Sequence, residues 1–226
     1  MNNADDDPAE AHEELSRPLS PRAALTRQTI LEAARTCFAK DGLAATSTRT
    51  IASAAGVTQP LIHHYFGSKE SLFEAVLDAT AGDYEASQAS QFALPSGDLR
   101  FFTSGLPVLF RWLGANQETL RLSAWARLQG YAVNTSNMRR VIEIVRARLV
   151  EAQGAGLLRS DVDIDATMVM IDAMLKGYWD RRESLGYYSV DPDVLDERYL
   201  RQSLQTLLRG LLTEDAAARA LATLAS

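Results

Sequence analysis

The residues of this 226-residue chain with the greatest capacity for surface chemistry lie close together, between positions 59 and 66. If this stretch is helical, Ile62 and Phe66 lie four positions apart and face inward, and the other side chains face outward. The outward residues are Gln59, Pro60, Leu61, His63, His64 and Tyr65. Glutamine can form two hydrogen bonds to adenine, apolar groups can touch thymine methyls, and histidine and tyrosine can reach phosphates. This composition predicts a helix that reads the major groove of DNA.

The two adjacent histidines could instead indicate a metal site or a catalytic base. Neighbouring helical residues point about 100° apart, so His63 and His64 are poorly placed to ligate one ion together. The third histidine, His12, is remote in the sequence, and the single cysteine, Cys37, is expected to be a small core residue on an apolar helix face. The sequence contains no glycine-rich phosphate loop and no cluster of acid, base and nucleophile. We therefore expect no catalytic residue, no metal site and no cofactor.

The distribution of charge along the chain supports a polyanion-binding module. The net charge is −6 overall, but residues 17–69 carry seven Lys or Arg and only two acidic residues. Residues 1–16 carry six acidic residues and no Lys or Arg, and residues 70–226 are also acidic on balance. A basic block between acidic neighbours is typical of a small nucleic-acid-binding unit attached to a larger body. An uneven solvated surface remains the alternative.

Two short predicted helices joined by a glycine turn would position these side chains. The expected helices run from Ser20 or Thr26 to Lys40, from Arg49 to Ala55, from Gln59 to Phe66, and onward from Ser68. Ile51, Ala54 and Ala55 are expected to form the buried side of the 49–55 helix, and Gly56 supplies the turn. Thr58 is expected to cap the following helix. Together these features predict a helix-turn-helix.

The rest of the chain also repeats apolar residues at intervals of three and four, which predicts an all-α fold. Further helices are expected over residues 99–114, 117–131, 136–155, 164–185 and 194–212, with a short tail after Glu214. No stretch approaches the length of a transmembrane helix, and the acidic N-terminal segment is unlike a signal peptide. We therefore expect a cytoplasmic protein with no membrane partner.

The run from Thr48 to Leu72, TRTIASAAGVTQPLIHHYFGSKESL, resembles the DNA-binding signature of the tetracycline-repressor family of bacterial regulators. The resemblance covers about residues 24–78. It implies a homodimer on a palindromic DNA operator, released by a small-molecule effector. It also implies a helix-turn-helix domain over residues 21–68 and a helical effector-binding and dimerisation domain over 69–226. The acidic, polar composition of residues 1–20 predicts a disordered tail before them.

The resemblance also assigns roles within the DNA-binding segment. Thr48 and Lys69 would bind phosphates, and Arg49 and Gln59 would contact bases. The full expected interface is Thr48, Arg49, Thr58, Gln59, Pro60, Leu61, His63, His64, Tyr65 and Lys69. The two histidines depart from the family, in which many members have aromatic residues such as tyrosine.

The C-terminal segment offers candidates for a ligand pocket and a dimer interface. Its aromatic and methionine residues could line an apolar cavity, although ordinary core packing is the alternative for each. The candidate ligand-binding residues are Trp112, Trp125, Arg127, Tyr131, Met174 and Tyr178. Because the helix over 164–185 is apolar on two faces, it is expected to contact a second subunit. The candidate interface residues are Ala173, Gly177, Leu204 and Leu208.

Two other functions fit parts of this pattern. The chain could bind DNA without any effector, or it could be a helical small-molecule-binding protein or enzyme whose basic segment is incidental. An enzyme should show a catalytic cluster in the C-terminal segment, and the sequence shows none. A DNA-binding transcriptional regulator, most often a repressor in this family, is therefore the leading hypothesis.

Overall fold

Helices form the architecture of the computed structural model, which describes residues 20–131, 135–188 and 190–225. The helices are α2 (Pro21–Ala45), α3 (Thr48–Ala55), α4 (Gln59–Phe66), α5 (Lys69–Ser87), α6 (Ala89–Phe92), α7 (Arg100–Ala115), α8 (Gln117–Leu128), α9 (Ser136–Gly154), α10 (Ile164–Arg181), the 3-10 helix η1 (Arg182–Tyr188), α11 (Pro192–Leu211) and α12 (Glu214–Ala225). The described residues contain no strand, only an isolated bridge between Leu158 and Leu212. The expected all-α fold is confirmed. Nearly all of the acidic tail expected at residues 1–20 lies outside the described residues.

The differences from the expected helices lie mainly at their ends. The backbone of α2 leaves helical geometry at Gly42, as expected, but a further turn extends the helix to Ala45. The helix expected over residues 164–185 ends at Arg181 and continues as η1. The expected tail after Glu214 is wrong, because this segment forms α12 and buries three alanines against the body. Within the described ranges, no helix combines the length and apolar character needed to cross a membrane.

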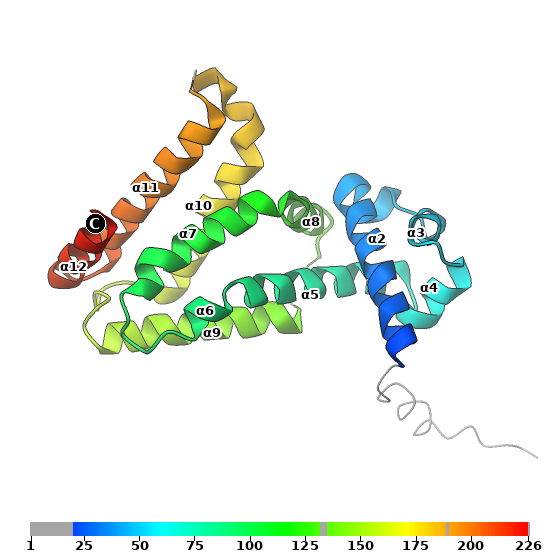
Figure 1. Ribbon diagram of the computed structural model, residues 1–226, viewed down its shortest axis with the longest axis horizontal. Helices are drawn as coiled ribbons and strands as arrows, with labels where there is room; N and C mark the ends of the chain where they lie inside the picture. The colour runs from blue at the N-terminus through cyan, green and yellow to red at the C-terminus, as the bar shows by residue number, and fades with distance from the viewer. Residues whose placement is uncertain (1–19, 132–134, 189, 226) are drawn as a thin grey trace, which may run out of the picture.

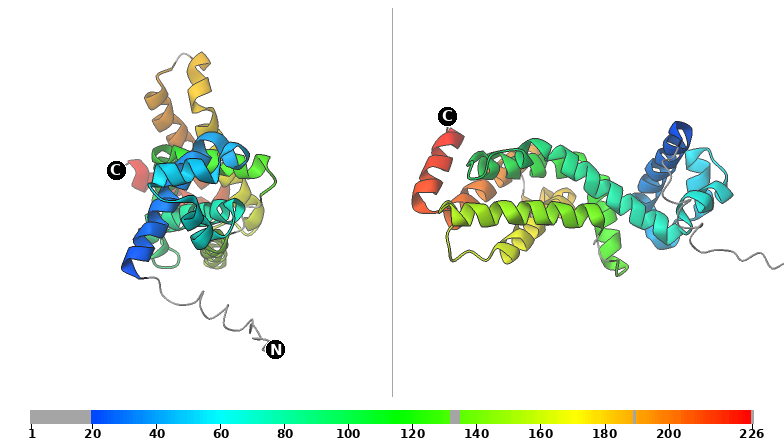
Figure 2. Two further views of the ribbon diagram at one scale, coloured as in Figure 1. Left: turned by 90° about the vertical axis from the view of Figure 1, so that its right-hand side faces the viewer. Right: turned by 90° about the horizontal axis from the view of Figure 1, so that it is seen from below.

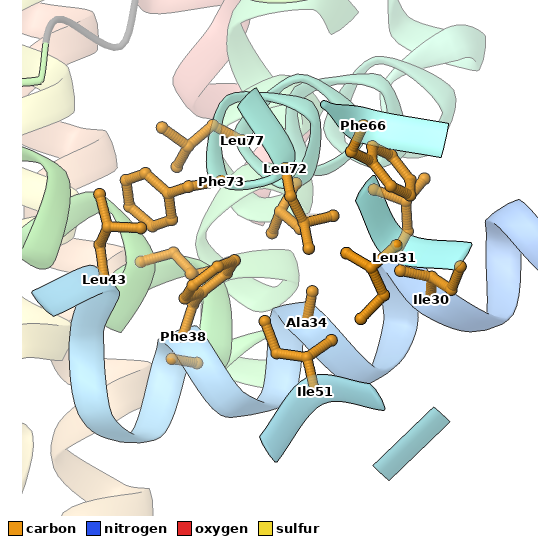
Figure 3. Close-up of a cluster of buried hydrophobic side chains, with 14 of the residues drawn as sticks. Ile30, Leu31, Ala34, Phe38, Leu43, Ile51, Phe66, Leu72, Phe73 and Leu77 are labelled. Carbon is orange, nitrogen blue, oxygen red and sulfur yellow. The ribbon is translucent and has the colours of Figure 1, made fainter. Parts of the chain in front are cut away.

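Helices α2, α3, α4 and the first half of α5 enclose one apolar core, which we call the head core (Figure 3). The largest fully buried side chains that these four helices contribute are Ile30, Phe38, Ile51, Ile62, Leu72, Phe73 and Val76. Phe38 of α2 meets Phe73 of α5 edge-on, with 5.1 Å between ring centroids. The expected burial of Ala54 is wrong. The inward face of α3 is centred between Ile51, Ala52 and Ala55, so Ala54 falls beyond its edge and is exposed.

The head lies at one end of an elongated helical body, and α5 runs from the head into the body (Figures 1 and 2). The body has two apolar clusters, one among α9, α11 and α12, and one among α7, α10 and α11. Leu122 and Ala126 of α8 are fully buried in the head core. A boundary at residue 68 would divide this core, because α5 and α8 both contribute to it.

Candidate DNA interface

The turn between α3 and α4 sets the angle between these two helices. Gly56 adopts φ 65° and ψ 30°, a left-handed conformation that glycine adopts without steric cost. The backbone N–H of Val57 then donates to the carbonyl of Ala52 at 3.0 Å, which closes the end of α3. At the start of α3, the Ser47 hydroxyl accepts the N–H of Thr50 at 3.0 Å. These contacts confirm the predicted helix-turn-helix.

Helix α4 turns its apolar side inward and its polar side to the surface. Ile62 is 1% exposed and Phe66 9%, as the spacing predicted. Gln59, Pro60, His63 and His64 are exposed, and Leu61 and Tyr65 are half-buried. Tyr65 is less open than expected because it packs partly against the head core. The free surface of α4 therefore offers one amide and two imidazoles.

Three hydrogen-bonding features determine which polar atoms remain available at this surface. Gln59 Nε2 donates to Thr48 Oγ1 at 2.7 Å, which links the starts of α3 and α4 and leaves Gln59 Oε1 as an acceptor. His63 Nδ1 lies 3.0 Å from the carbonyl of Gly67 and carries the proton there, because a carbonyl only accepts. The Thr58 side chain makes no capping hydrogen bond, contrary to expectation. Pro60 has no N–H, and the Leu61 N–H donates to the Thr58 carbonyl at 3.1 Å, so of the first three residues of α4 only Gln59 offers a backbone N–H to an anion.

The cations of the head differ in whether they already have partners. Arg35 pairs with Asp83 of α5. Among the described residues, Arg22, Arg27, Lys40 and Arg49 form no ion pair. Lys69, which was expected to bind a phosphate, instead donates its ammonium to two backbone carbonyls, Leu43 at 2.7 Å and Thr46 at 3.0 Å.

Two of the six candidate ligand-binding residues contact the head instead of a body cavity. The Trp125 ring lies directly against Gly42 of α2. Tyr131 meets Phe73 edge-on, with 5.5 Å between ring centroids, and packs against the head core. Both residues therefore lie where the body meets the DNA-binding head. Sequence reasoning missed this role, because Gly42 and Trp125 are far apart in the chain.

The other four candidates lie in the body. Trp112, Met174 and Tyr178 pack in the cluster around Phe110 and Leu175. Tyr178 Oη donates to Asp196 at 2.6 Å, and burial together with this carboxylate raises the pKa of Tyr178. Arg127 lies at the surface, 3.7 Å from Asp180. The six residues therefore do not gather around one cavity.

A half-buried tyrosine beside this cluster went unnoticed in the sequence. Tyr84 of α5 meets Trp112 edge-on at 5.4 Å between ring centroids. Burial raises the pKa of Tyr84 to about 12, and the Asp172 carboxylate adds to the increase. A surface hollow of about 220 Å³, lined by Arg35 and residues 115–119, includes none of the six candidates.

Helix α10 has an exposed apolar face, as its two-sided pattern predicted. Val169 is 70% exposed and Met170 49%, Ala173 is exposed, and a Cβ at Gly177 would meet nothing within 4 Å. The expectation for Leu204 and Leu208 is wrong. They are 6% and 3% exposed in the chain's own core, because α11 packs against α7 and α12.

A helix-turn-helix whose second helix is free to enter a groove, beside several unpaired cations, defines a DNA-binding protein. Comparison with known sequences agrees with this class. The sequence model of the tetR family of bacterial regulatory proteins matches residues 30–76. The chain is a DNA-binding transcriptional regulator whose head matches the TetR family.

Relatives resemble the chain well beyond the head. The transcriptional repressor AcnR of Corynebacterium efficiens is 29% identical over 161 residues, which are 69% of this chain and 81% of AcnR. The transcriptional repressor NicS of Pseudomonas putida is 28% identical over 172 residues, 72% of this chain and 80% of NicS.

Solved structures share the fold over most of the chain. The TetR-family protein CprB of S. coelicolor has a TM-score of 0.60 at 23% identity, covering 86% of this chain and 93% of CprB. SmeT, the repressor of the Stenotrophomonas maltophilia efflux pump SmeDEF, has a TM-score of 0.64 at 18% identity, covering 84% of this chain and 92% of SmeT.

Proposed function

We propose that this regulator represses transcription by binding a palindromic operator in the cytoplasm as a homodimer, as a binding protein and not as an enzyme. The exposed polar face of α4 carries the proposal, because Gln59, His63 and His64 lie at the surface and the contact with Thr48 leaves Gln59 Oε1 as an acceptor for a base edge. The names of AcnR and NicS, both transcriptional repressors, support the sign of regulation.

The proposed DNA contacts divide by chemistry. Arg49 and Gln59 read base edges, and the backbone N–H of Gln59 at the start of α4 binds a phosphate beside Thr58. Thr48 faces the phosphate backbone of the DNA. Its hydroxyl also holds the side-chain amide of Gln59 in place. The apolar and ring contacts come from Pro60, Leu61, His63, His64 and Tyr65.

Replacing Gln59 with alanine is expected to weaken operator binding and relax base preference. A bidentate contact to a base contributes about 1–3 kcal/mol of discrimination, so cognate affinity should fall by that amount while binding to arbitrary DNA changes little. The operator can be found by selecting binding sites from random duplexes and by gel shifts on DNA flanking the gene. Titrations on cognate and scrambled duplexes then measure the discrimination.

The matched control is Gln28→Ala, because Gln28 is an exposed glutamine of α2 that bonds only to Glu32. This variant should retain full discrimination. Equal losses for Gln59→Ala on cognate and scrambled DNA would contradict a base-reading role.

We further propose that an effector acts through the junction between head and body. Helix α5 spans both parts, and the head is held to the body by Trp125 against Gly42 and by the hydrogen bond from the Asn137 N–H to Asp78 at 2.9 Å. A ligand among Trp112, Met174 and Tyr178 would shift α7 and α10 and so change the separation of the two heads.

An effector that prefers the DNA-incompetent arrangement should bind less tightly when operator DNA is present. Linkage requires the two ligands to weaken each other by the same factor, typically about 5–150-fold. Tryptophan fluorescence can follow titration of a small-molecule panel with and without operator, at fixed salt because DNA affinity depends on salt. Identical ligand affinities in both titrations would rule out allosteric release by that ligand.

A further inference from the structure

The surroundings of Lys69 indicate an internal contact. Its ammonium donates to the carbonyls of Leu43 and Thr46, which lie on the bend that links α2 to α3. A second hydrogen bond stabilises the same bend: the hydroxyl of the buried Thr46 donates to the carbonyl of Gly42 at 2.6 Å. Two of the three ammonium protons are therefore used by the protein. Lys69 fastens the start of α5 to the segment that leads into α3.

Arg27 has the opposite character. Its guanidinium lies over the ring of Phe66, 5.0 Å from the ring centroid, beside the last residue of α4. This contact restrains a planar group with five donors while leaving its edge free. Between residues 20 and 69 the acidic side chains are Glu32 and Asp41, and neither pairs with Arg27. Arg27 thus places an unneutralised positive charge next to the C-terminal end of α4, the helix proposed to enter the DNA groove.

We propose that Arg27, and not Lys69, is the cation beside α4 that neutralises a DNA phosphate, and that Lys69 is a positioning residue. The inference rests on DNA binding through α4. A restrained guanidinium loses little freedom on meeting a phosphate, and it matches phosphate oxygens with two parallel hydrogen bonds. Moving the Lys69 ammonium to a phosphate would leave the Leu43 and Thr46 carbonyls without this donor.

The salt dependence of DNA binding separates these two roles. Each phosphate contact releases counterions, so log K falls against log salt with a slope of about 0.9 per contact. The titrations compare wild type with three variants: Arg27→Ala, Lys69→Met and the control Lys40→Ala. Each protein is titrated into a labelled duplex of about 30 base pairs, a length that suits one dimer, between about 50 and 200 mM KCl. Lys40 is the control because it is an exposed cation of α2 that, like the half-buried Arg27, has no ion pair among the described residues. The protein bound per duplex is measured in the same titrations.

Arg27→Ala is expected to reduce the slope by about 0.9 for each protomer bound, while Arg27→Lys retains most of it. Lys69→Met keeps the aliphatic stem, so it should leave the slope unchanged and lower Tm by about 3–8 °C through loss of two charge-assisted hydrogen bonds. Lys40→Ala should match wild type in slope and in Tm. A duplex of arbitrary sequence suffices because the phosphate contribution is independent of sequence.

The opposite pattern, in which Lys69→Met reduces the slope and Arg27→Ala does not, would overturn the proposal. An unchanged slope for Arg27→Ala overturns it even if Lys69→Met fails to fold. A slope reduced equally by Arg27→Ala and Lys40→Ala would show only a general effect of net charge, and would also contradict it. Loss of all DNA binding by wild type would instead refute the function proposed for α4, which keeps the two failures distinguishable.

Discussion

A single carboxylate at position 173 is expected to convert the proposed homodimer to monomers and to lower operator affinity by about 100-fold or more. Ala173 is the centre of the exposed apolar face of α10, between Met170 and Gly177. If two copies pack through this face, Ala173→Asp buries an unpaired charge on each side of the two-fold axis. Losing the partner also removes the second reading head, whose linked binding contributes about 10²–10⁴ in avidity.

The matched control is Ala147→Asp, the same substitution at an exposed alanine of α9. Sedimentation and gel shifts on one operator duplex measure assembly and affinity. The control should remain dimeric and bind as wild type does. An Ala173→Asp variant that stays dimeric would place the interface elsewhere. Leu204→Asp is no test of the interface, because Leu204 is buried in the chain's own core and a charge there would disrupt folding.

The sequence predicted the reading face of α4 because one helix period decides it. Ile62 and Phe66 lie four positions apart and face inward, which places His63 and His64 at the surface, whereas Tyr65 packs partly against the head core. The hydrogen bond between Thr48 and Gln59 could not be foreseen in the same way. It depends on the angle that the Gly56 turn imposes between two helices, which no single-helix pattern encodes.

The misplaced interface residues show a second limit of the sequence. Leu204 and Leu208 have the same apolar character that an intersubunit contact would require. Their burial depends in part on the final helix α12, which looked like a short tail in the sequence. A periodic apolar stripe predicts that a face is covered, but it does not say whether the covering helix belongs to the same chain.

The charged residues show a third limit. Lys69 follows a helix cap in the sequence, a position that suggests a phosphate contact, and its stem is long enough to turn inward instead. Its partners, the carbonyls of Leu43 and Thr46, lie at the end of α2 and directly after it, more than twenty positions earlier in the chain. Arg27 gave no sequence signal at all, because its contact with Phe66 exists only once α2 and α4 are packed.

The bend that holds these carbonyls also leads to the largest expected effect on stability. Gly42 has φ 73° and ψ 174°, a region that is essentially restricted to glycine. A Cβ there would lie 2.8 Å from Trp125 Cδ2 and 2.9 Å from Cε3. Gly42→Ala is therefore expected to lower the free energy of unfolding by about 2–6 kcal/mol, through backbone strain of about 1–3 and overpacking of about 1–3. The shift of the urea midpoint measures the loss.

Gly56→Ala provides the control, since Gly56 also has a positive φ but a Cβ there would meet nothing within 4 Å. It should cost only about 1–2 kcal/mol of backbone strain. A double-mutant cycle with Trp125→Ala then isolates the steric part: without the indole, Gly42→Ala should lose about 1–3 kcal/mol of its cost. Additive effects would show that the Trp125 ring does not restrict position 42. The Trp125 ring of α8 packs against Gly42, next to the residues whose carbonyls accept hydrogen bonds from Lys69. A non-additive result would therefore identify a physical connection between the body and the DNA-binding head.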